Sequence, residues 1–285
     1  MPFRSQPLSR KLLAALKICH SAGPSDGTPG CAPHKKPPPP LDRQSALFLD
    51  VDGTLIEIAS RPELVQVPRQ LAALLDRLAR QRDGALAVIS GRPVADLDRL
   101  LSPWRGAAAG LHGAERRRPD GSAASSDPDP QDADAAAALQ WLRPRLAELA
   151  GATPGVWLED KGRTLALHYR AVPERGGEMR DLVARLAEEA GGRLRLIAGK
   201  MVLELQSEAY GKGRAIAAFL AEAPFRGRRA VFLGDDTTDE DGFAEVNRRG
   251  GLAIRVGAPS ATTAASWTLD SVAAVLEWLA ADGDA

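Results

Sequence analysis

Three small groups of polar residues carry side chains that could do chemistry together. The groups are Asp50 with Asp52, Ser90 with Arg92, and Asp235 with Asp236 and Asp239. Each follows a short apolar run, and the ligand crevice of a doubly wound α/β sheet lies beyond the carboxyl ends of its strands. One such group alone would be an ordinary turn or helix cap. Three in succession indicate a shared functional site.

The apolar runs before these groups predict buried parallel strands joined by helices. Between the first two runs, Leu71, Leu74, Leu75 and Leu78 recur at helical spacing, which completes a β-α-β unit. The expected strands are 46–49, 85–89, 106–109, 230–233 and 252–256, and the expected helices are 68–82, 93–101, 213–222, 239–248 and 270–280. This alternation predicts an α/β domain with a parallel sheet.

A different pattern fills the middle of the chain. Residues 116–137 are rich in Asp, Ser, Pro and Ala and are expected to form an exposed linker. After it the order helix-strand-strand occurs twice, with helices at 135–149 and 176–190 and strands near 156–159, 164–169, 193–198 and 201–205. The repeat predicts a small α+β domain with an antiparallel sheet, inserted between the two halves of the larger domain.

Composition excludes several classes of partner. Lys and Arg together number 37, as do Asp and Glu, so the zero net charge provides no global field for nucleic acid or an anionic membrane. No apolar run approaches the about 20 residues that cross a bilayer. The two cysteines, Cys19 and Cys31, form no disulfide framework. We therefore expect a cytoplasmic protein that acts on a small molecule, while its oligomeric state stays unknown.

Residues 1–44 differ from the rest of the chain. They are rich in Gly, Pro and basic residues and end in the run Pro37–Pro40, a composition that favours extended polyproline II and buries little surface. We expect a disordered extension. A targeting or docking arm is the alternative, because Arg10, Lys11 and Lys17 form a short basic patch.

The order of the core motifs resembles one known superfamily. D-x-D-G-T-L stands at 50–55, S-G-R at 90–92, K-G at 212–213 and G-D-D-x-T-D at 234–239. Over residues 45–280 the chain resembles haloacid dehalogenase (HAD) phosphatases, and within them the trehalose-6-phosphate phosphatases. The resemblance implies a Rossmann-like core with an inserted C2-type cap of order αββαββ. The expected parts are the extension 1–44, the core segments 45–116 and 207–285, and the linker and cap 117–206.

The resemblance assigns the chemistry to the D-x-D pair. It implies that Asp50 is the nucleophile and Asp52 the general acid and base. A carboxylate that attacks phosphorus divides one difficult displacement into two, while a second carboxyl protonates the departing sugar oxygen. Asp50 must therefore be ionised, whereas Asp52 must arrive protonated and later take a proton from water.

Transfer of a phosphoryl group also needs a cation, and the resemblance implies Mg²⁺. Asp50 would offer a carboxylate oxygen, Asp52 its main-chain carbonyl, and Asp235 a second carboxylate. Asp239 would bind the ion directly or through water. Asp236 is expected beside these ligands and among the substrate-binding residues.

Phosphate binding is assigned to four further residues. The family positions fall on Thr54, Ser90, Gly91 and Lys212. The Ser90 hydroxyl would donate a hydrogen bond, and the Lys212 ammonium would act as a point charge. A cation at a helix N-terminus opposes the helix dipole, so Lys212 requires an anion nearby.

The inserted segment carries the signs of a sugar substrate. E-D-K at 159–161, H-Y-R at 168–170, G-K-M-V-L-E at 199–204 and G-L-H-G-A-E at 110–115 resemble segments of the trehalose-6-phosphate phosphatases. Glu159 and Glu204 can accept hydrogen bonds from hydroxyls while Lys161 donates, which suits a polyol. His112 is expected to shape the rim of the site, and both His112 and Arg92 are expected to bind the substrate.

Two points in this segment limit the assignment. His168 is expected to be structural, because it belongs to a strand. The family often continues after the glutamate of G-K-x-V-x-E with Arg-Pro, whereas Leu205, Gln206 and Ser207 follow Glu204 here. This departure removes a positive group that the family places near the second sugar ring.

The resulting hypothesis is a trehalose-6-phosphate phosphatase with a functional link to a synthase. Another capped HAD sugar phosphatase, acting on sucrose phosphate, mannosylphosphoglycerate or a hexose phosphate, is the nearest alternative. An inactive relative that senses sugar phosphates is the alternative from another class. Such proteins usually lose a nucleophile or metal ligand, and those positions are filled here.

Overall fold

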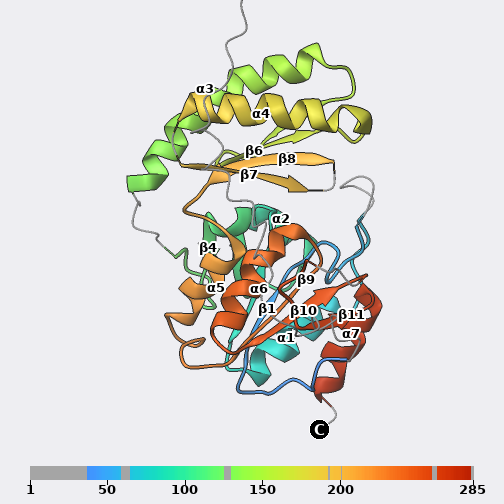
Figure 1. Ribbon diagram of the computed structural model, residues 1–285. Coiled ribbons are helices and arrows are strands. Elements are labelled where there is room, and N and C mark those ends of the chain that lie inside the picture. The colour runs from blue at the N-terminus through green and yellow to red at the C-terminus, as the bar shows by residue number, and fades with distance from the viewer. Residues whose placement is uncertain are drawn as a thin grey trace, which may run out of the picture. The chain divides into compact units, whose positions relative to one another are not determined.

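The structure is a computed structural model (Figure 1) that describes residues 37–58, 65–124, 130–191, 193–199, 201–258 and 262–283. Expectations for residues 1–36, including the basic patch and both cysteines, and for Lys200 of the G-K-M-V-L-E segment lie outside the described residues. Among the helices that are described, none is long and apolar enough to cross a membrane.

A seven-stranded sheet forms the larger part of the fold. Its strands are β1 (Ala46–Leu49), β2 (Leu86–Ile89), β3 (Ala107–Gly110), β4 (Glu115–Arg117), β9 (Ala230–Gly234), β10 (Leu252–Val256) and β11 (Trp267–Leu269). Their order is β11-β10-β9-β1-β2-β3-β4, and each pair is parallel except β3 with β4. The predicted α/β core with a parallel sheet is confirmed.

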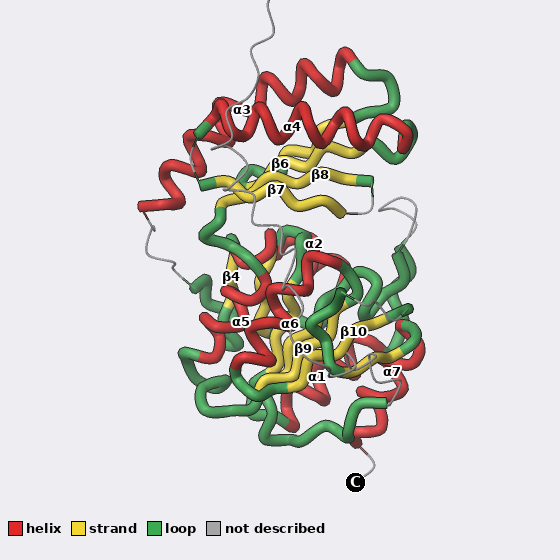
Figure 2. Tube along the Cα trace, viewed as in Figure 1, coloured by secondary structure: helices red, strands yellow, loops and turns green. Residues whose placement is uncertain are grey.

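Helices cover both faces of this sheet because its central strands are apolar on both sides. The helices are α1 (Leu71–Gln81), α2 (Val94–Leu100), α5 (Lys212–Leu220), α6 (Glu240–Arg248) and α7 (Val272–Ala280). Leu49 of β1 packs in one cluster with α1, α2 and α7, whereas Phe48 packs in a second cluster with α5 and α6. Figure 2 shows the strands in yellow with the helices in red beside them.

The strand order brings the three polar groups to one place. Strands β9, β1 and β2 are neighbours, and they end immediately before Asp235, Asp50 and Ser90. The main-chain N–H of Asp50 donates to the carbonyl of Leu233 at 3.0 Å, which continues the ladder to the last residue before the site. The carboxyl ends of three adjacent strands therefore position the candidate site.

A separate four-stranded sheet forms the inserted part. Its elements are α3 (Pro130–Ala152), β5 (Trp157–Asp160), β6 (Thr164–His168), α4 (Gly176–Ala190), β7 (Leu194–Gly199) and β8 (Val202–Ser207). The sheet has the order β5-β6-β8-β7 with antiparallel pairs. Helices α3 and α4 lie over one face of it (Figure 1), where they enclose a third apolar cluster. The predicted αββαββ cap is confirmed.

Several local features differ from the sequence expectations. Strand β4 pairs with β3 and so belongs to the core sheet, although the expected linker began at 116. Helix α3 begins at Pro130, earlier than expected, because the Ala-rich stretch that follows has high helix propensity. This stretch has little amphipathic pattern, so the early start was not predicted. Strand β11 is only three residues long and was not predicted.

The end of the expected disordered extension is also part of the fold. Residues 37–44 are described, and Leu41 packs against the apolar cluster of α1 and α7. The carbonyl of Arg43 accepts a hydrogen bond from Arg228 at 3.3 Å. The proline run predicted an extended segment that buries little surface, so these contacts were not expected.

A buried ion pair ties the end of the described chain to α1. The Arg82 side chain is 0% exposed, and its Nη2 lies 2.6 Å from Oδ2 of Asp282. Removing one partner of such a pair leaves a buried charge without compensation. We expect Asp282→Ala to lower the free energy of unfolding by about 3–5 kcal/mol in chemical denaturation.

The control for this prediction is the exposed pair of Arg80 and Asp76 on α1. Asp76→Ala should change the free energy of unfolding by less than about 1 kcal/mol. Equal effects of Asp282→Ala and Asp76→Ala would show that the buried pair has no special role in stability.

Candidate active site

One cavity of about 380 Å³ is lined by residues of the core, at the ends of its strands, and by residues of the cap sheet. Among its lining residues are Asp50, Asp52, Ser90, Gly91, Arg92, His112, Glu159, Lys161, Glu204, Lys212, Asp235 and Asp236. The remaining two predicted site residues, Thr54 and Asp239, are 0% exposed and bind residues that line the cavity. The structure thus brings all fourteen predicted site residues together.

Lys212 is the charged centre of the cavity floor. Its Nζ donates to Oδ1 of Asp50 and to Oδ1 of Asp239, each at 2.6 Å. The Thr54 hydroxyl donates to the other oxygen of Asp50 at 3.1 Å. Two anions therefore lie beside the cation at the first residue of α5, which confirms the prediction that a lysine opposing the helix dipole has an anion nearby.

Asp239 is held rigidly below this floor. Its Oδ2 accepts the main-chain N–H groups of Asp235 at 3.1 Å and Asp236 at 3.0 Å. A Cβ atom at Gly234 would lie 2.3 Å from the Asp239 carboxyl carbon, so only glycine allows this approach. Both oxygens of Asp239 have partners, which favours a positioning role for its carboxylate.

Three carboxylates, those of Asp50, Asp235 and Asp239, lie around the single ammonium of Lys212. Burial raises the pKa of Asp50 well above its ordinary value, and Asp239 and Asp235 raise it further while Lys212 opposes them. Burial by itself lowers the pKa of Lys212, but attraction to Asp239 and Asp50 outweighs it and raises that pKa. Three carboxylates beside one ammonium need a further cation if all are to be ionised.

The carboxylates also have the geometry to hold that cation. One oxygen each from Asp50, Asp235 and Asp239 lie within 4.8 Å of one another, and the three are the candidate metal-binding group in the described part of the chain. A Cβ atom at Gly53 would lie 2.2 Å from Asp235 Oδ2, so the D-x-D-G turn leaves room for this carboxylate. A donor set of oxygens suits a hard divalent ion.

Asp52 makes a contact that the sequence did not predict. Its two oxygens accept hydrogen bonds from Nε and Nη2 of Arg92, both at 2.6 Å. The hydrogen bond to Asp52 raises the pKa of Arg92. Both carboxylate oxygens of Asp52 are thus engaged by one guanidinium, whereas the expected acid role requires an oxygen that can reach the departing group.

Ser90 and Gly91 form a tight loop against His112. The Ser90 hydroxyl accepts the main-chain N–H of Arg92 at 3.1 Å, and its carbonyl accepts the N–H of His112 at 2.9 Å. A Cβ atom at Gly91 would lie 2.7 Å from Nε2 of His112. His112 itself has φ of 54°, a left-handed conformation that is costly for a residue with a side chain and recurs at functional sites.

The open face of the four-stranded sheet presents polar side chains in cross-strand rows. Residues that alternate along β5, β6, β8 and β7 share this face, opposite the face covered by α3 and α4. One row is Trp157, His168, Val202 and Gly199, and the next is Glu159, Ala166, Glu204 and Ile197. The strand register thus places both predicted glutamates in the same row.

Glu204 lies at the meeting point of the two sheets. Its Oε2 is 3.6 Å from Nε2 of His112 and 3.7 Å from Nζ of Lys161. Burial by itself raises the pKa of Glu204, but the contacts with His112 and Lys161 outweigh it and lower that pKa to about 2. Glu204 is therefore an anion at any ordinary pH.

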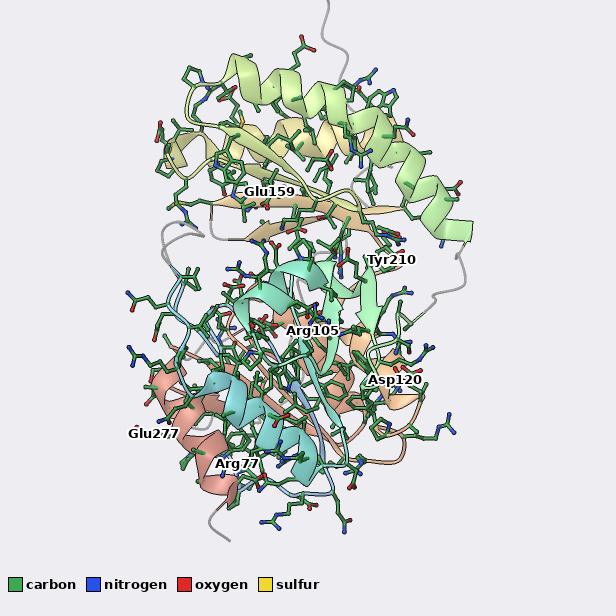
Figure 3. The ribbon with its side chains drawn as sticks, turned by 180° about the vertical axis from the view of Figure 1, so that it is seen from behind. Arg77, Arg105, Asp120, Glu159, Tyr210 and Glu277 are labelled. Atoms are coloured by element: carbon green, nitrogen blue, oxygen red, sulfur yellow. The ribbon has the colours of Figure 1, made fainter. Side chains whose placement is uncertain are left out.

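His168 lines the cavity, although its place in a strand predicted a structural role. Its Nε2 lies 3.0 Å from Oε2 of Glu159, and the ring stacks on Trp157 with centroids 3.8 Å apart. The hydrogen bond with His168 lowers the pKa of Glu159, which Figure 3 labels. The alternation of side chains along the strand could have predicted that His168 lies on this face. Its stacking on Trp157 could be predicted only from the register of β5 and β6.

Comparison with known proteins identifies the family of this chain. The family model described as trehalose-phosphatase matches residues 48–273. A probable trehalose-phosphate phosphatase of Sinorhizobium fredii is 43% identical over 236 residues, which cover 83% of this chain and 86% of that protein. The trehalose-6-phosphate phosphatase of Escherichia coli K12 is 43% identical over 242 residues, which cover 85% of this chain and 87% of that protein.

A solved structure supports the fold. The C-terminal domain of the C. albicans trehalose-6-phosphate phosphatase has a TM-score of 0.71 at 24% identity, over 86% of this chain and 98% of that one. With the family model matching most of the chain and two bacterial relatives at 43% identity, the chain belongs to the trehalose-phosphatase family.

Proposed function

We propose that the protein hydrolyses trehalose 6-phosphate to trehalose and inorganic phosphate. The observation that carries this proposal is the shared cavity, in which the Asp50 carboxylate and the Glu159, Lys161 and Glu204 side chains face one space. Core residues would act on the phosphate while cap residues bind the sugar hydroxyls. The relatives named for this substrate agree with the assignment.

In the proposed first step an Asp50 oxygen attacks phosphorus, and the bond between phosphorus and the C6 oxygen of the sugar breaks. Asp52 gives its proton to the departing oxygen, and a phospho-aspartate remains on Asp50. In the second step Asp52 takes a proton from water while that water attacks phosphorus. The aspartyl bond breaks, phosphate leaves, and Asp50 is restored.

Arg92 has a specific place in this proposal. Asp52 can act on the substrate only after its contact with Arg92 opens, because both of its oxygens accept hydrogen bonds from that guanidinium. The incoming phosphate is a stronger partner for the guanidinium than a single carboxylate, because it carries more charge. Substrate binding would therefore draw Arg92 away and release Asp52 toward the sugar oxygen.

The proposed cofactor is Mg²⁺. Asp50 and Asp235 would hold it with carboxylate oxygens, Asp52 with its main-chain carbonyl, and Asp239 directly or through water. Asp239 is itself positioned by Lys212 and by the N–H groups of Asp235 and Asp236. When bound, the ion neutralises charge on the transferring phosphoryl group. Ser90, Thr54, Gly91 and Lys212 are the proposed phosphate-binding residues.

The cap provides the proposed sugar contacts. Glu204 and Glu159 are anions that accept hydrogen bonds from hydroxyls, and Lys161 lies 3.7 Å from Glu204 and 3.9 Å from Glu159. His112, Arg92 and Asp236 line the same cavity from the core. A link to a synthase that supplies the sugar phosphate and a cytoplasmic location stay predictions.

The nucleophile assignment predicts the effect of Asp50→Asn. The amide is not a competent nucleophile toward phosphorus, so we expect phosphate release from trehalose 6-phosphate to fall by several orders of magnitude with the melting temperature retained. Asp76→Asn, a matched change far from the cavity, should keep the wild-type rate. A rate of Asp50→Asn above about a hundredth of wild type would exclude Asp50 as the nucleophile.

The metal assignment predicts loss of activity in EDTA and recovery on adding Mg²⁺. Asp235→Asn should raise the Mg²⁺ concentration that gives half-maximal activity by more than about tenfold, because removing a direct ligand weakens binding. The measurement is phosphate release across a Mg²⁺ titration. Full activity in excess EDTA would refute the metal requirement.

The cap assignment predicts different effects on two substrates. Lys161→Ala and Glu204→Gln should each lower kcat/KM for trehalose 6-phosphate by at least about tenfold, or about 1.4 kcal/mol, because each leaves a sugar group unpaired. Against a small aryl phosphate the same variants should stay within about threefold of wild type. Glu188→Gln, an exposed change on α4, is the control, and equal losses on both substrates would contradict a role in sugar recognition.

A further inference from the structure

The residues on either side of Lys212 pack closely against Asp241 of α6. A Cβ atom at Gly211 would lie 2.3 Å from the Asp241 carboxylate, and one at Gly213 would lie 2.5 Å from the Asp241 carbonyl oxygen. Glycine at both positions thus lets Asp241 lie against the backbone that carries Lys212. Asp241 is outside the set of residues assigned to the chemistry.

An arginine of the cap reaches the same backbone. Arg195 of β7 donates from Nη2 to the carbonyl of Tyr210 at 3.0 Å, and a Cβ atom at Gly211 would lie 3.0 Å from this nitrogen. Figure 3 labels Tyr210, which lies on the segment that leads from β8 to α5. The peptide between Tyr210 and Gly211 is therefore held between a cap cation and a core anion.

The contact between the two charged groups is loose. Arg195 Nη2 lies 3.9 Å from Asp241 Oδ2, about 1 Å longer than a direct guanidinium–carboxylate hydrogen bond. Within the described residues, Nε of Arg195 and Oδ1 of Asp241 are buried and have no hydrogen-bond partner. A small movement of β7 toward α6 would turn this arrangement into a two-pronged pair and give both atoms a partner.

We propose that Arg195 and Asp241 form a latch that tightens when the cap closes and fixes the position of Lys212. The proposal rests on the proposed function, because it assumes a cap that closes over a sugar phosphate. The two side chains are 39% and 32% exposed, so their attraction alone stabilises the fold little. Their effect is geometric: the latch holds the peptide before Lys212, whose ammonium binds Asp50.

The latch separates binding from turnover. The Arg195 and Asp241 side chains are not among the residues that line the main cavity, so their loss should leave substrate affinity nearly unchanged. Their loss would instead weaken the closed state in which Lys212 is aligned. Arg195 and Asp241 are therefore positioning residues, and the variants should affect kcat more than KM.

The test uses Arg195→Gln, Asp241→Asn and the double variant, in the full chain with Mg²⁺. Asp241→Asn keeps the shape that packs on Gly211 and removes only the charge. Each single variant should lower kcat for trehalose 6-phosphate by about tenfold, with KM within about threefold of wild type. The double variant should be no slower than Arg195→Gln alone, because Asp241 acts through Arg195 and its loss has no further effect once Arg195 is removed.

A small aryl phosphate and two exposed positions provide the controls. The aryl phosphate needs no closed cap, so the latch variants should hydrolyse it within about threefold of the wild-type rate. Arg180→Gln and Asp181→Asn are matched charge changes on the exposed side of α4 and should leave both substrates unaffected. Melting temperatures report whether each variant is folded.

Three results would overturn the latch. They are unchanged kcat in both single variants, additive losses in the double variant, and equal losses on the aryl phosphate, which would assign the residues to general stability. Wild-type protein is first assayed on trehalose 6-phosphate, sucrose 6-phosphate and glucose 6-phosphate. Preference for another sugar phosphate would overturn the proposed function, and the latch would then be tested with that substrate.

Discussion

The buried contact of Lys212 with Asp50 and Asp239 is the constraint on which the rest of the structure depends. A cation and two anions that are almost wholly buried lose their hydration, and only their close mutual geometry compensates for that loss. The geometry requires the end of β1, the start of α5 and the turn after β9 to meet at one point. The parallel order β9-β1-β2, with apolar side chains on both faces, brings the two strand ends together. The large sheet can therefore be understood as the support for one charge cluster.

The four-stranded sheet of the cap has one apolar face and one polar face. One of its faces is covered by α3 and α4, and the other carries charged and aromatic side chains that must stay hydrated or bind a ligand. Period-two alternation gives both properties to the same four strands. Glu204 illustrates the outcome, because the next residue, Leu205, is in the apolar cluster while Glu204 faces the cavity. Recognition and chemistry thus come from separate layers that meet at the cavity.

Much of this arrangement could be predicted from the sequence. Asp50, Ser90 and Asp235 follow apolar runs, and a parallel sheet makes the ends of such runs neighbours whatever its exact register. The stacking of His168 on Trp157 and the pairing of Arg92 with Asp52 depend on register and rotamer, which local patterns do not encode. Strand β4 was missed because Glu115–Arg117 is a polar edge strand without an apolar pattern. Asp241 was not predicted because its proposed role depends on close packing against Gly211 and Gly213, which have no Cβ atom. No sequence motif marks such packing.

The cap has an apolar cluster of its own, and this independence has a thermal consequence. No residue of the buried cluster around Leu142, Met179 and Leu205 belongs to either cluster of the large sheet, in the part of the chain that the structure describes. Units with separate cores open with separate free energies. Because the apolar cluster of the cap is the smallest of the three, warming would melt the cap first and leave the charge cluster on the large sheet intact. The enzyme would lose its choice of substrate at a lower temperature than its ability to cleave a phosphate ester.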